Sequence, residues 1–412
     1  MSLSADLSRG RIIAISTDLL FPAIHGGRLA VLGQCKALLN SGFTVSLIVF
    51  HRDRMSNADR ARHLEVSPDA VFVKRKGFLR TLIRHPLLPY QAGSRTLSRA
   101  EVARLIDLTK PIRAIMAHQE WTLKTAGEIM RLQNVPIVLC SQNDEVKYLI
   151  SLIGDAYGVR KIYFQLELAR LKLTLKSMLR LADLVTVLGD ADKEIYERND
   201  KHSVLVRPIL TEVLFDATNP TVAQSAKIIF VGSLDLPHAA AGVLWFVRSV
   251  MPLILTQRPD AVFHVAGRNA SDTLTAELRS SSGVIFHGAM ADLSPLYDDA
   301  RIFINPIFAG SGVNMKMGLP SELGLPIVTT TIGARGLASL ASGMVQADDP
   351  SSFAKACENL LGDDDEWSRR SHALRDGIEE YSAAVVGREL ATIVAALPEA
   401  HVRRPSDSTT TK

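Results

Sequence analysis

The chain has 412 residues, which is enough for two large domains or three small ones at about 150 residues per domain. Apolar residues make up 47% and charged residues 22%, so the composition is that of a globular protein and excludes a largely disordered chain. The net charge of +4 hides an asymmetry, because residues 1–205 carry 30 basic and 20 acidic side chains and residues 206–412 carry 17 and 23. Opposite signs in the two halves indicate two domains with different partners.

The three cysteines, Cys35, Cys140 and Cys357, are far apart in the chain and form no CxxC pair. We therefore expect no disulfide framework and no cysteine zinc site, and a reducing compartment such as the cytoplasm. No apolar run is expected to reach the eighteen or so residues of a membrane span, and the first sixteen residues lack the basic and then apolar pattern of a signal peptide.

Short apolar runs alternate with longer helical patterns, which is typical of parallel α/β units. In the first half, a strand is predicted over 11–16, a helix over about 28–40 and a second strand over 44–50. Further strands are predicted over 71–73, 114–117, 137–141 and 184–188.

The second half restarts the same alternation. A strand over 227–232 ends in glycine, and a helix is expected over 239–256. Strands follow over 261–266, 283–286, 301–305 and 327–330. Residues 207–227 are rich in proline and small polar residues and are predicted to be the linker.

These patterns predict two Rossmann-like domains, residues 1–206 and residues 207–385, in an α/β fold. A helix over about 365–381 is a candidate to pack back across the hinge. Residues 386–412 are expected to form the end of the C-terminal helix and a polar tail, disordered from about residue 403.

The most informative stretch runs from Asn305 to Lys316, where a strand ends, Gly310 and Gly312 flank Ser311, and a helix is predicted to begin. Glycines at such a turn let a phosphate approach backbone N–H groups, and the start of a helix adds partial positive charge. Lys316 is predicted to lie one turn into this helix, where it could reach the same anion. A tight strand-to-helix turn without a ligand explains the glycines about equally well.

The segment GSGVNMK, followed by GLPIVTTTIGARGL, resembles the donor-binding motif of retaining, family-4-type glycosyltransferases of the GT-B fold, the glycosyl transferases of group 1. Residues 228–267 resemble the opening of their second domain, and IFHG with DLSPLY resembles the step before the motif. With the loop at Gly26 and the segment LADLVTV, the resemblance covers most of residues 11–340. It implies two Rossmann-like domains that face each other across a cleft.

The resemblance also implies roles for individual residues. Gly26 and Gly27 would close on the donor diphosphate, and the backbone of residues 310–313 would donate hydrogen bonds to the same phosphates. Lys316 would be the catalytic cation beside them. The residues assigned to this phosphate group are Gly26, Gly27, Gly310, Ser311, Gly312, Val313 and Lys316.

Other positions are assigned from the ends of predicted strands. His118 falls where these enzymes place a catalytic histidine near the transferred sugar or the acceptor, with a solvent-facing histidine as the alternative. Gly232 and Arg268 are assigned to the donor side, although Arg268 is about as well explained as a surface charge. His264 and His287 are expected to be core histidines.

Two departures from the family pattern affect the donor site. Ser233 and His238 stand where relatives often carry a basic residue and a lysine, so part of the phosphate clamp is missing or replaced. Leu319 stands where a glutamate usually binds the nucleotide ribose. Pro320 is expected to end the first helical turns at Leu319, after which Glu322 could take over the ribose contact.

Two basic segments of the first half contain apolar residues at close intervals. Seven basic residues and no acid lie between Asp69 and Glu101, and residues 157–181 carry six basic residues against one glutamate. Such segments suit an anionic membrane surface, and a solvated helix face explains them about equally well. We expect Arg80, Arg84, Arg95 and Arg99 to contribute to membrane binding. Nucleic acid is not expected as a partner, because the second half is acidic and carries no binding motif.

Together these features predict a glycosyltransferase that moves a hexose from a nucleotide-sugar to a glycan or lipid-linked acceptor, without a metal or other cofactor. The protein is expected in the cytoplasm, peripherally on the inner face of the membrane. A degenerate GT-B protein that only binds a nucleotide or a partner, and a nucleotide-sugar epimerase or hydrolase, remain as alternatives. An NAD enzyme is disfavoured because no GxGxxG follows the first strand.

Overall fold

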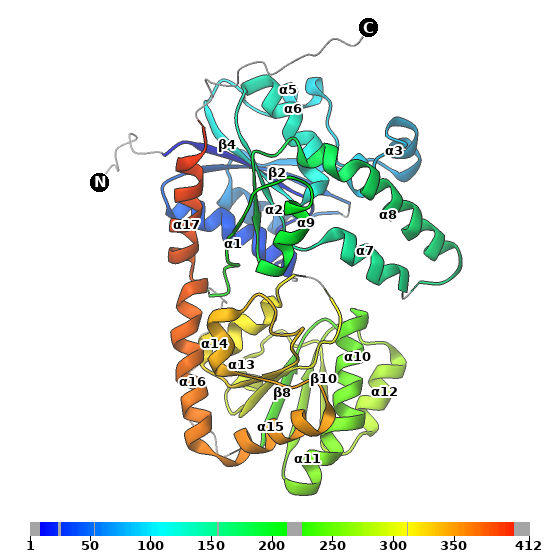
Figure 1. Ribbon diagram of the computed structural model, residues 1–412, viewed down its shortest axis with the longest axis vertical. Helices are drawn as coiled ribbons and strands as arrows, with labels where there is room; N and C mark the ends of the chain where they lie inside the picture. The colour runs from blue at the N-terminus through cyan, green and yellow to red at the C-terminus, as the bar shows by residue number, and fades with distance from the viewer. Residues whose placement is uncertain are drawn as a thin grey trace. The chain divides into compact units, whose positions relative to one another are not determined.

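The computed structural model describes residues 9–23, 26–52, 54–154, 156–211, 225–310 and 312–398 (Figure 1). The chain forms two compact units, which divide after Ile209 and again after Ser382. The first unit contains the described residues up to 209 together with 383–398, and the second contains those from 210 to 382. The boundaries expected from the sequence, at 206/207 and 385/386, lie within three residues of these divisions. Most of the expected linker, residues 212–224, and the polar tail lie outside the described residues.

The first unit is built on a seven-stranded sheet in the order β3-β2-β1-β4-β5-β6-β7, in which all neighbouring strands are parallel. The strands are β1 (Arg11–Ser16), β2 (Thr44–His51), β3 (Val71–Lys74), β4 (Ile112–His118), β5 (Ile137–Cys140), β6 (Leu184–Val187) and β7 (Ser203–Leu205). All residues of β1 are buried, because helices cover both faces of a parallel sheet. The strand β7 was not expected from the sequence.

Two apolar clusters fill the two faces of this sheet. Ile13 and Ile15 belong to one cluster and Ile12 and Ala14 to the other, as the alternation of side chains along a strand requires. The helices are α1 (Gly26–Asn40), α2 (Asn57–Val66), α3 (Phe78–Arg84), α4 (Tyr90–Gly93), α5 (Arg99–Leu105), α6 (Leu123–Gln133), α7 (Glu145–Gly154), α8 (Gly158–Leu179), α9 (Lys193–Glu197) and α17 (Ala383–Ala396).

The C-terminal helix α17 packs against α1 in the first unit, and the two lie side by side in Figure 1. A Cβ atom at Gly387 would lie 3.0 Å from the carbonyl oxygen of Ala37, so glycine allows the two helices to approach closely. The sequence proposed the helix over 365–381 for this return. That assignment is wrong, because the corresponding helix, α16 (Asp364–Ile378), packs within the second unit. Residues 386–396 belong to a helix of the first unit and not to a separate terminal segment.

The second unit repeats the design with a six-stranded parallel sheet in the order β10-β9-β8-β11-β12-β13. Its strands are β8 (Lys227–Val231), β9 (Val262–Ala266), β10 (Val284–Gly288), β11 (Ile302–Asn305), β12 (Ile327–Thr329) and β13 (Met344–Gln346). Its other helices are α10 (Pro237–Trp245), α11 (Met251–Gln257), α12 (Asp272–Ser280), α13 (Ser294–Tyr297), α14 (Gly318–Leu323) and α15 (Pro350–Gly362).

The helical stretch Pro237–Gln257 is, by length and composition alone, long and apolar enough to cross a membrane. The expectation that no apolar run reaches that length is therefore wrong. Phe246, Val250 and Ile254 of this stretch are buried in the core of the second unit, which accounts for its apolar character. The stretch passes through a π-helical turn, Phe246–Val250, just before Pro252, which lacks an N–H group for the regular helical bond.

Each sheet reverses its strand order next to its first strand, between β1 and β4 and between β8 and β11. In open parallel sheets, ligands bind outside the carboxyl ends of the strands at this reversal. We therefore expect the ligand site of the first unit to include residues after β1 and β4. In the second unit, the corresponding residues follow β8 and β11.

Candidate functional site

In the second unit, the loop after β11 has a backbone that only glycine adopts easily. Gly310 has φ 135° and Gly312 has φ 77°, and the carbonyl oxygen of Gly310 accepts a hydrogen bond from Arg335 Nη1 at 3.3 Å. Ser311 lies outside the described residues. Among the residues that the structure describes, the backbone N–H groups of Gly312 and Val313 donate to no protein acceptor. The loop therefore offers donors to an anion, as the glycine pattern indicates.

The helix after this loop begins later than predicted, with a 3₁₀ turn at Met315–Met317 that leads into α14. Pro320 does not end a helix at Leu319; it is the third residue of α14. Its missing N–H group is tolerated there, because the first N–H groups of a helix have no intrahelical partner. The expectation of a break and restart at Pro320 is therefore wrong.

The ammonium group of Lys316 lies over the ring of Phe230, 4.6 Å from its centroid, at the end of β8. A Cβ atom on Gly232 would lie 3.7 Å from Lys316 Nζ, so glycine leaves room beside the ammonium group. Burial lowers the pKa of Lys316 to about 7. The pKa of His238, at the start of α10, is also lowered, by burial and by the nearby Lys316. Among the described residues, no carboxylate forms an ion pair with Lys316.

The loops after β8 and β9 are held together beside Lys316. Arg268 Nε donates to Ser233 Oγ at 3.0 Å, and the N–H group of Leu234 donates to the carbonyl oxygen of Arg268 at 3.0 Å. A Cβ atom at Gly267 would lie 2.5 Å from the carbonyl oxygen of Gly232, so the chains touch backbone to backbone. The structure thus brings Gly232 and Arg268 together at the carboxyl edge of the sheet, and Ser233 anchors Arg268.

The two positions at issue for ribose binding both lie on α14. Leu319 packs against an apolar cluster of the second unit, and Glu322 is half-buried one turn later. A leucine side chain accepts no hydrogen bond, so a ribose contact by α14 depends on Glu322. The role of Glu322 stays a prediction.

In the first unit, the carboxyl ends of the strands surround a cavity of about 290 Å³, here called the arginine cavity. Gly26 and Gly27 are the first residues of α1, and Gly27 lines the cavity. The carbonyl oxygen of Gly27 accepts a hydrogen bond from Gln142 Nε2 at 3.2 Å. The lining residues with polar or charged side chains are Ser16, Thr17, Asp18, Arg28, Arg52, Arg75, Gln91, Arg95, Gln119 and Gln142.

Two guanidinium groups of this cavity share one neutral acceptor. Gln91 Oε1 accepts from Arg75 Nη2 at 3.0 Å and from Arg95 Nη1 at 2.7 Å. Arg95 is only 5% exposed, and its Nε atom donates to the carbonyl oxygen of Thr17 at 2.9 Å. Burial, and then repulsion from Arg75, lower the pKa of Arg95 to about 9. The expectation that Arg95 faces a membrane is wrong, because its guanidinium group is buried at the sheet edge.

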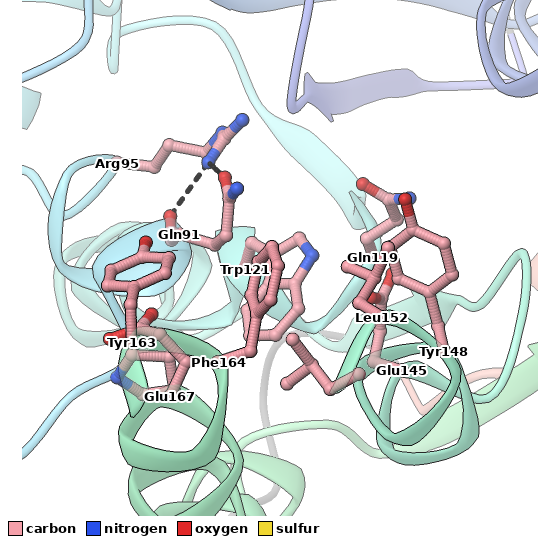
Figure 2. Close-up of a pocket in the computed structure, with 12 residues that line it drawn as sticks. Gln91, Arg95, Gln119, Trp121, Glu145, Tyr148, Leu152, Tyr163, Phe164 and Glu167 are labelled. Atoms are coloured by element: carbon pink, nitrogen blue, oxygen red, sulfur yellow. Dashed lines mark hydrogen bonds between the residues drawn. The ribbon is translucent and has the colours of Figure 1, made fainter. Parts of the chain in front are cut away.

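A second cavity of about 270 Å³, the aromatic cavity, adjoins the first, since Gln91, Arg95 and Gln119 line both. Figure 2 shows Trp121 in its centre, with Tyr163 and Phe164 coming from α8 on one side and Tyr148 from α7 on the other. Aromatic faces beside polar groups are suited to sugar rings, which present apolar C–H faces and hydroxyl edges.

The two carboxyl groups of the aromatic cavity have different surroundings. Glu167 pairs with Arg170 at 2.8 Å and accepts a hydrogen bond from the N–H group of Tyr90 at 2.6 Å, so it ties α8 to α4. Glu145 forms no ion pair among the described residues, and burial followed by repulsion from Glu120 raises its pKa well above the usual value. The hydrogen bond with Trp121 and the attraction to Arg95 act in the opposite direction. Glu145 is therefore the carboxyl group of this cavity without an ion pair.

Glu120 lies behind Trp121 and accepts a hydrogen bond from Tyr196 Oη. Burial raises the pKa of Glu120 to about 7. Gln119, the residue before it, adopts φ 63°, a conformation that costs a non-glycine residue about 1–3 kcal/mol. A hydrogen bond of 2.8 Å from Thr17 Oγ1 to Gln119 Oε1 helps to hold this side chain where it lines both cavities.

The structure places His118 inside the first unit. Its side chain is 1% exposed, it lines neither cavity, and burial lowers its pKa to about 4. The solvent-facing alternative is therefore wrong, and the predicted contact of His118 with sugar or acceptor stays a prediction. Its neighbour Gln119 lines both cavities. His264 and His287 were expected in the core, but His287 is exposed; its Nε2 atom lies 3.0 Å from Nδ1 of His264.

Sequence reasoning missed most of the residues that line the cavities, including Trp121 and Glu145. A signal for three of them was present, because Arg52, Arg75 and Gln119 each come directly after an observed strand. In the residues that the structure describes, no group of three or more His, Cys, Asp or Glu side chains could hold a metal ion. All three cysteines are buried free thiols.

An exposed apolar surface lies beside the aromatic cavity, formed by α3 and α8, and is here called the α3–α8 face. Phe78 joins the two helices, with its ring centroid 6.2 Å from that of Tyr163. Exposed apolar residues of these two helices are Leu79, Ile83, Val159, Ile162 and Leu166, and Leu87 follows shortly after α3. Exposed basic residues among them are Arg80, Arg84, Arg160 and Lys161.

Residues 225–363, most of the second unit, match the family described as glycosyl transferases group 1. This match coincides with the glycine loop and Lys316. The second unit is therefore similar to the glycosyl transferases of group 1, and the chain as a whole has the GT-B fold. The first unit of the chain lies outside the matched residues, so the family match says nothing about the arginine and aromatic cavities.

The chain is 26% identical over 367 residues to an uncharacterised 44.6 kDa protein in the cps region of Klebsiella pneumoniae, covering 84% of this chain and 89% of that protein. Its fold is similar to that of sucrose-phosphate synthase from Thermosynechococcus elongatus, with a TM-score of 0.65 at 16% identity over 94% of this chain and 98% of that one. It is also similar to HepE of Anabaena in complex with UDP and glucose, with a TM-score of 0.64 at 13% identity over 94% of this chain and all of that one.

Proposed function

We propose that this glycosyltransferase moves a hexose from a nucleotide-sugar to a glycan or lipid-linked acceptor, with retention of configuration, in polysaccharide assembly. The observation that carries the proposal is Lys316 beside the glycine loop at the carboxyl ends of β8 and β11, within the family match. The donor being a nucleotide-sugar is supported by the similarity to HepE in complex with UDP and glucose. The relative in a cps region supports polysaccharide assembly.

In the proposed reaction, the bond from the sugar C1 atom to the nucleoside diphosphate breaks and a bond from C1 to an acceptor hydroxyl oxygen forms. The acceptor hydroxyl passes its proton to the departing diphosphate oxygen, and the negative charge that develops on the diphosphate as the bond breaks must be stabilised. The N–H groups of Gly312 and Val313 and the ammonium group of Lys316 supply that stabilisation. Because this positive charge comes from the protein, we propose that the transfer needs no divalent metal.

We further propose that the enzyme works on the cytoplasmic face of a membrane through the α3–α8 face. Leu79, Ile83 and Val159 are 70%, 73% and 84% exposed, which is unusual for large apolar side chains unless a partner covers them. Arg80 and Arg84 beside them favour an anionic lipid surface. The neighbouring aromatic cavity would then open near lipid-linked acceptors.

A thermal-shift panel of nucleoside diphosphates and nucleotide-sugars tests the proposed donor site, because a ligand at 100 times its Kd stabilises a protein by about 2.7 kcal/mol. The binding nucleotide-sugar is then incubated with membrane lipid extract, with and without EDTA, and the product anomer is assigned by NMR. A retained anomer formed in EDTA is the expected result.

Other outcomes would contradict parts of the proposal. An inverted anomer would exclude retention, and dependence on a divalent cation would exclude metal-independent transfer. Release of free sugar or an isomer without acceptor would favour a hydrolase or epimerase. If no nucleotide stabilises the protein, the replacement of the ribose glutamate by Leu319 has removed donor binding, and the degenerate GT-B alternative is the better one.

A further inference from the structure

The arginine cavity is lined by more positively charged side chains than carboxylates. Four arginines line it, and Asp18, which pairs with Arg28 at 2.8 Å, is the only acidic residue that the described part of the chain contributes to the lining. Arg52, Arg75 and Arg95 form no ion pair with a carboxylate among the described residues, although Asp18 lies near enough to attract Arg75 and Arg95. Like charges are costly to hold together, so this arrangement favours a bound anion.

Two of these arginines, Arg75 and Arg95, are held in place by neutral groups. Gln91 Oε1 binds Arg75 and Arg95 together, and backbone carbonyl oxygens take two further donors of Arg95. The Nη2 group of Arg95 has no acceptor among the described residues, and the buried Nε atom of Arg75 has no partner. Guanidinium groups fixed in this way present their remaining N–H donors without further loss of side-chain freedom.

The start of α1, a helix of 15 residues, lines the same cavity through Gly27. The partial positive charge of a helix N-terminus adds to that of the arginines. With three arginines in excess over Asp18, the cavity matches a phosphate dianion better than a singly charged carboxylate.

The aromatic cavity continues from this anion site through Gln91, Arg95 and Gln119. A ligand can therefore place an anionic group among the arginines and a sugar ring against Trp121 at the same time. Glu145 lies on the sugar side, where a protonated or ionised carboxyl group can bind hydroxyl groups.

We propose that the acceptor of this glycosyltransferase is a phosphorylated saccharide, with its phosphate or diphosphate bound by Arg52, Arg75 and Arg95 and its sugar ring in the aromatic cavity. The inference rests on the proposed function, because it names the acceptor of the same reaction. A soluble sugar phosphate and the head group of a lipid-linked diphosphate sugar share this chemistry.

The first test isolates the anion site from the donor site. In the background Lys316→Met, which weakens the anion site of the second unit, pyrophosphate binding is measured by calorimetry. The structure predicts that this variant still binds pyrophosphate and that adding Arg52→Gln and Arg75→Gln weakens the binding at least tenfold. The exposed pair Arg99→Gln and Arg104→Gln removes the same charge outside both cavities and should change the affinity less than twofold. Absence of pyrophosphate binding, or equal loss in both pairs, would overturn the proposal.

The second test asks whether the anion belongs to an acceptor. Wild-type protein is titrated with glucose 1-phosphate, glucose, glucuronate and a farnesyl diphosphate-linked glucose in detergent. We expect at least one phosphorylated ligand to bind 100-fold more tightly than glucose. The same ligand should quench the tryptophan fluorescence of the wild type, and this quenching should be absent in Trp121→Phe. Pyrophosphate, which has no sugar ring, should not cause this quenching. Binding of the lipid-linked compound alone would identify the lipid source, and preference for glucuronate would overturn the phosphate assignment.

The third measurement separates this proposal from the proposed function. Arg52→Gln with Arg75→Gln should leave the affinity for the best-binding nucleoside diphosphate within twofold, whereas Lys316→Met should lower it. If the arginine variant loses nucleoside diphosphate and keeps the sugar phosphate, the arginine cavity belongs to the donor site and the proposal is wrong. If no nucleotide binds but the sugar phosphate does, the proposed transfer fails while the anionic saccharide site stands.

Discussion

The two units have the same sheet design but place different chemistry at the same topological position. Both sheets are parallel and reverse their order beside the first strand. At this reversal the second unit offers backbone N–H groups of a glycine loop and one lysine, whereas the first unit offers a cluster of arginine side chains next to aromatic rings. The comparison shows that the sheet fixes where a ligand binds and the loops after the strands fix which ligand it is.

The two sites also differ in how their positive charge is maintained. Lys316 is desolvated over Phe230 and its pKa falls to about 7, so it gains charge when an anion arrives. Arg95 has its pKa lowered to about 9 and remains charged at neutral pH. The donor site should therefore respond to pH near neutrality, and the arginine cavity should not.

The largest effect is expected on membrane binding by the α3–α8 face of the first unit. Changing Arg80, Arg84, Arg160 and Lys161 to glutamine should weaken binding to phosphatidylserine vesicles by two to three orders of magnitude, since each basic residue contributes about 1 kcal/mol near such a surface. Vesicle sedimentation at two salt concentrations measures it. Arg104→Gln should have little effect, because Arg104 is an exposed residue of α5, outside the α3–α8 face. Equal binding of the wild type to neutral vesicles would contradict an electrostatic surface.

A smaller effect is expected at the donor site of the second unit. Lys316→Met should lower the affinity for nucleoside diphosphate about ten- to a hundredfold, since a charge-assisted hydrogen bond contributes about 1.5–3 kcal/mol. Thermal stability should stay level or rise, because the buried ammonium group is replaced by an apolar chain. Calorimetry and thermal melting measure the two quantities, with the exposed Lys355→Met as control. Unchanged diphosphate affinity would place the anion site elsewhere.

The pH dependence of binding sharpens the contrast between lysine and arginine. Because burial lowers the pKa of the empty Lys316 to about 7 and a bound anion favours the charged form, binding takes up a proton above pH 7. Nucleoside diphosphate affinity should fall roughly tenfold between pH 7 and 8.5. Lys316→Met should remove most of this dependence. Pyrophosphate binding to the arginine cavity should change little over the same range, and a parallel fall at both sites would break the comparison.

Loss of a ribose contact is expected to lower nucleotide affinity less than the loss of Lys316. If Glu322 replaces the missing glutamate at Leu319, Glu322→Gln should lower nucleotide affinity by about tenfold or less, as for one hydrogen bond, and leave thermal stability nearly unchanged. Nucleotides that lack the 2′ or 3′ hydroxyl should then bind the wild type poorly. Equal affinity for ribonucleotides and deoxynucleotides, with a variant like the wild type, would mean that Glu322 has no part in ribose binding.

The smallest effect concerns the buried carboxyl group behind the aromatic cavity. The pKa of Glu120 is raised to about 7 in the folded protein, so between about pH 4.5 and 7 the folded state binds more protons than the unfolded state. Stability should therefore fall as pH rises through this range. In Glu120→Gln, the decrease in Tm over the same range should be smaller than in the wild type by a few degrees. The glutamine can still accept the hydrogen bond from Tyr196 Oη. A melting profile identical to that of the wild type would show that Glu120 does not titrate there.

The sequence by itself determined most of the strands, the two-unit organisation and the glycine loop after β11. The predicted strands over 11–16 and 227–232 correspond to β1 and β8, because a run of apolar residues ending in polar or glycine residues is a local pattern. Gly310 and Gly312 were identifiable for the same reason, since their positive φ angles are a local requirement. The position of Lys316 close to the glycine loop could be predicted because only a few residues of chain separate them.

Only the tertiary structure decided which side chains reach a cavity. His118 and Gln119 are neighbours at one strand end, yet His118 is buried in the unit and Gln119, with φ 63°, lines both cavities. Arg95 looked like one more basic surface residue until Thr17 and Gln91 were found to bind its guanidinium group. Likewise, α17 packs on α1 across more than 300 residues of chain. A local sequence pattern determines the secondary structure, but the position of a side chain depends on contacts with residues that are distant in sequence.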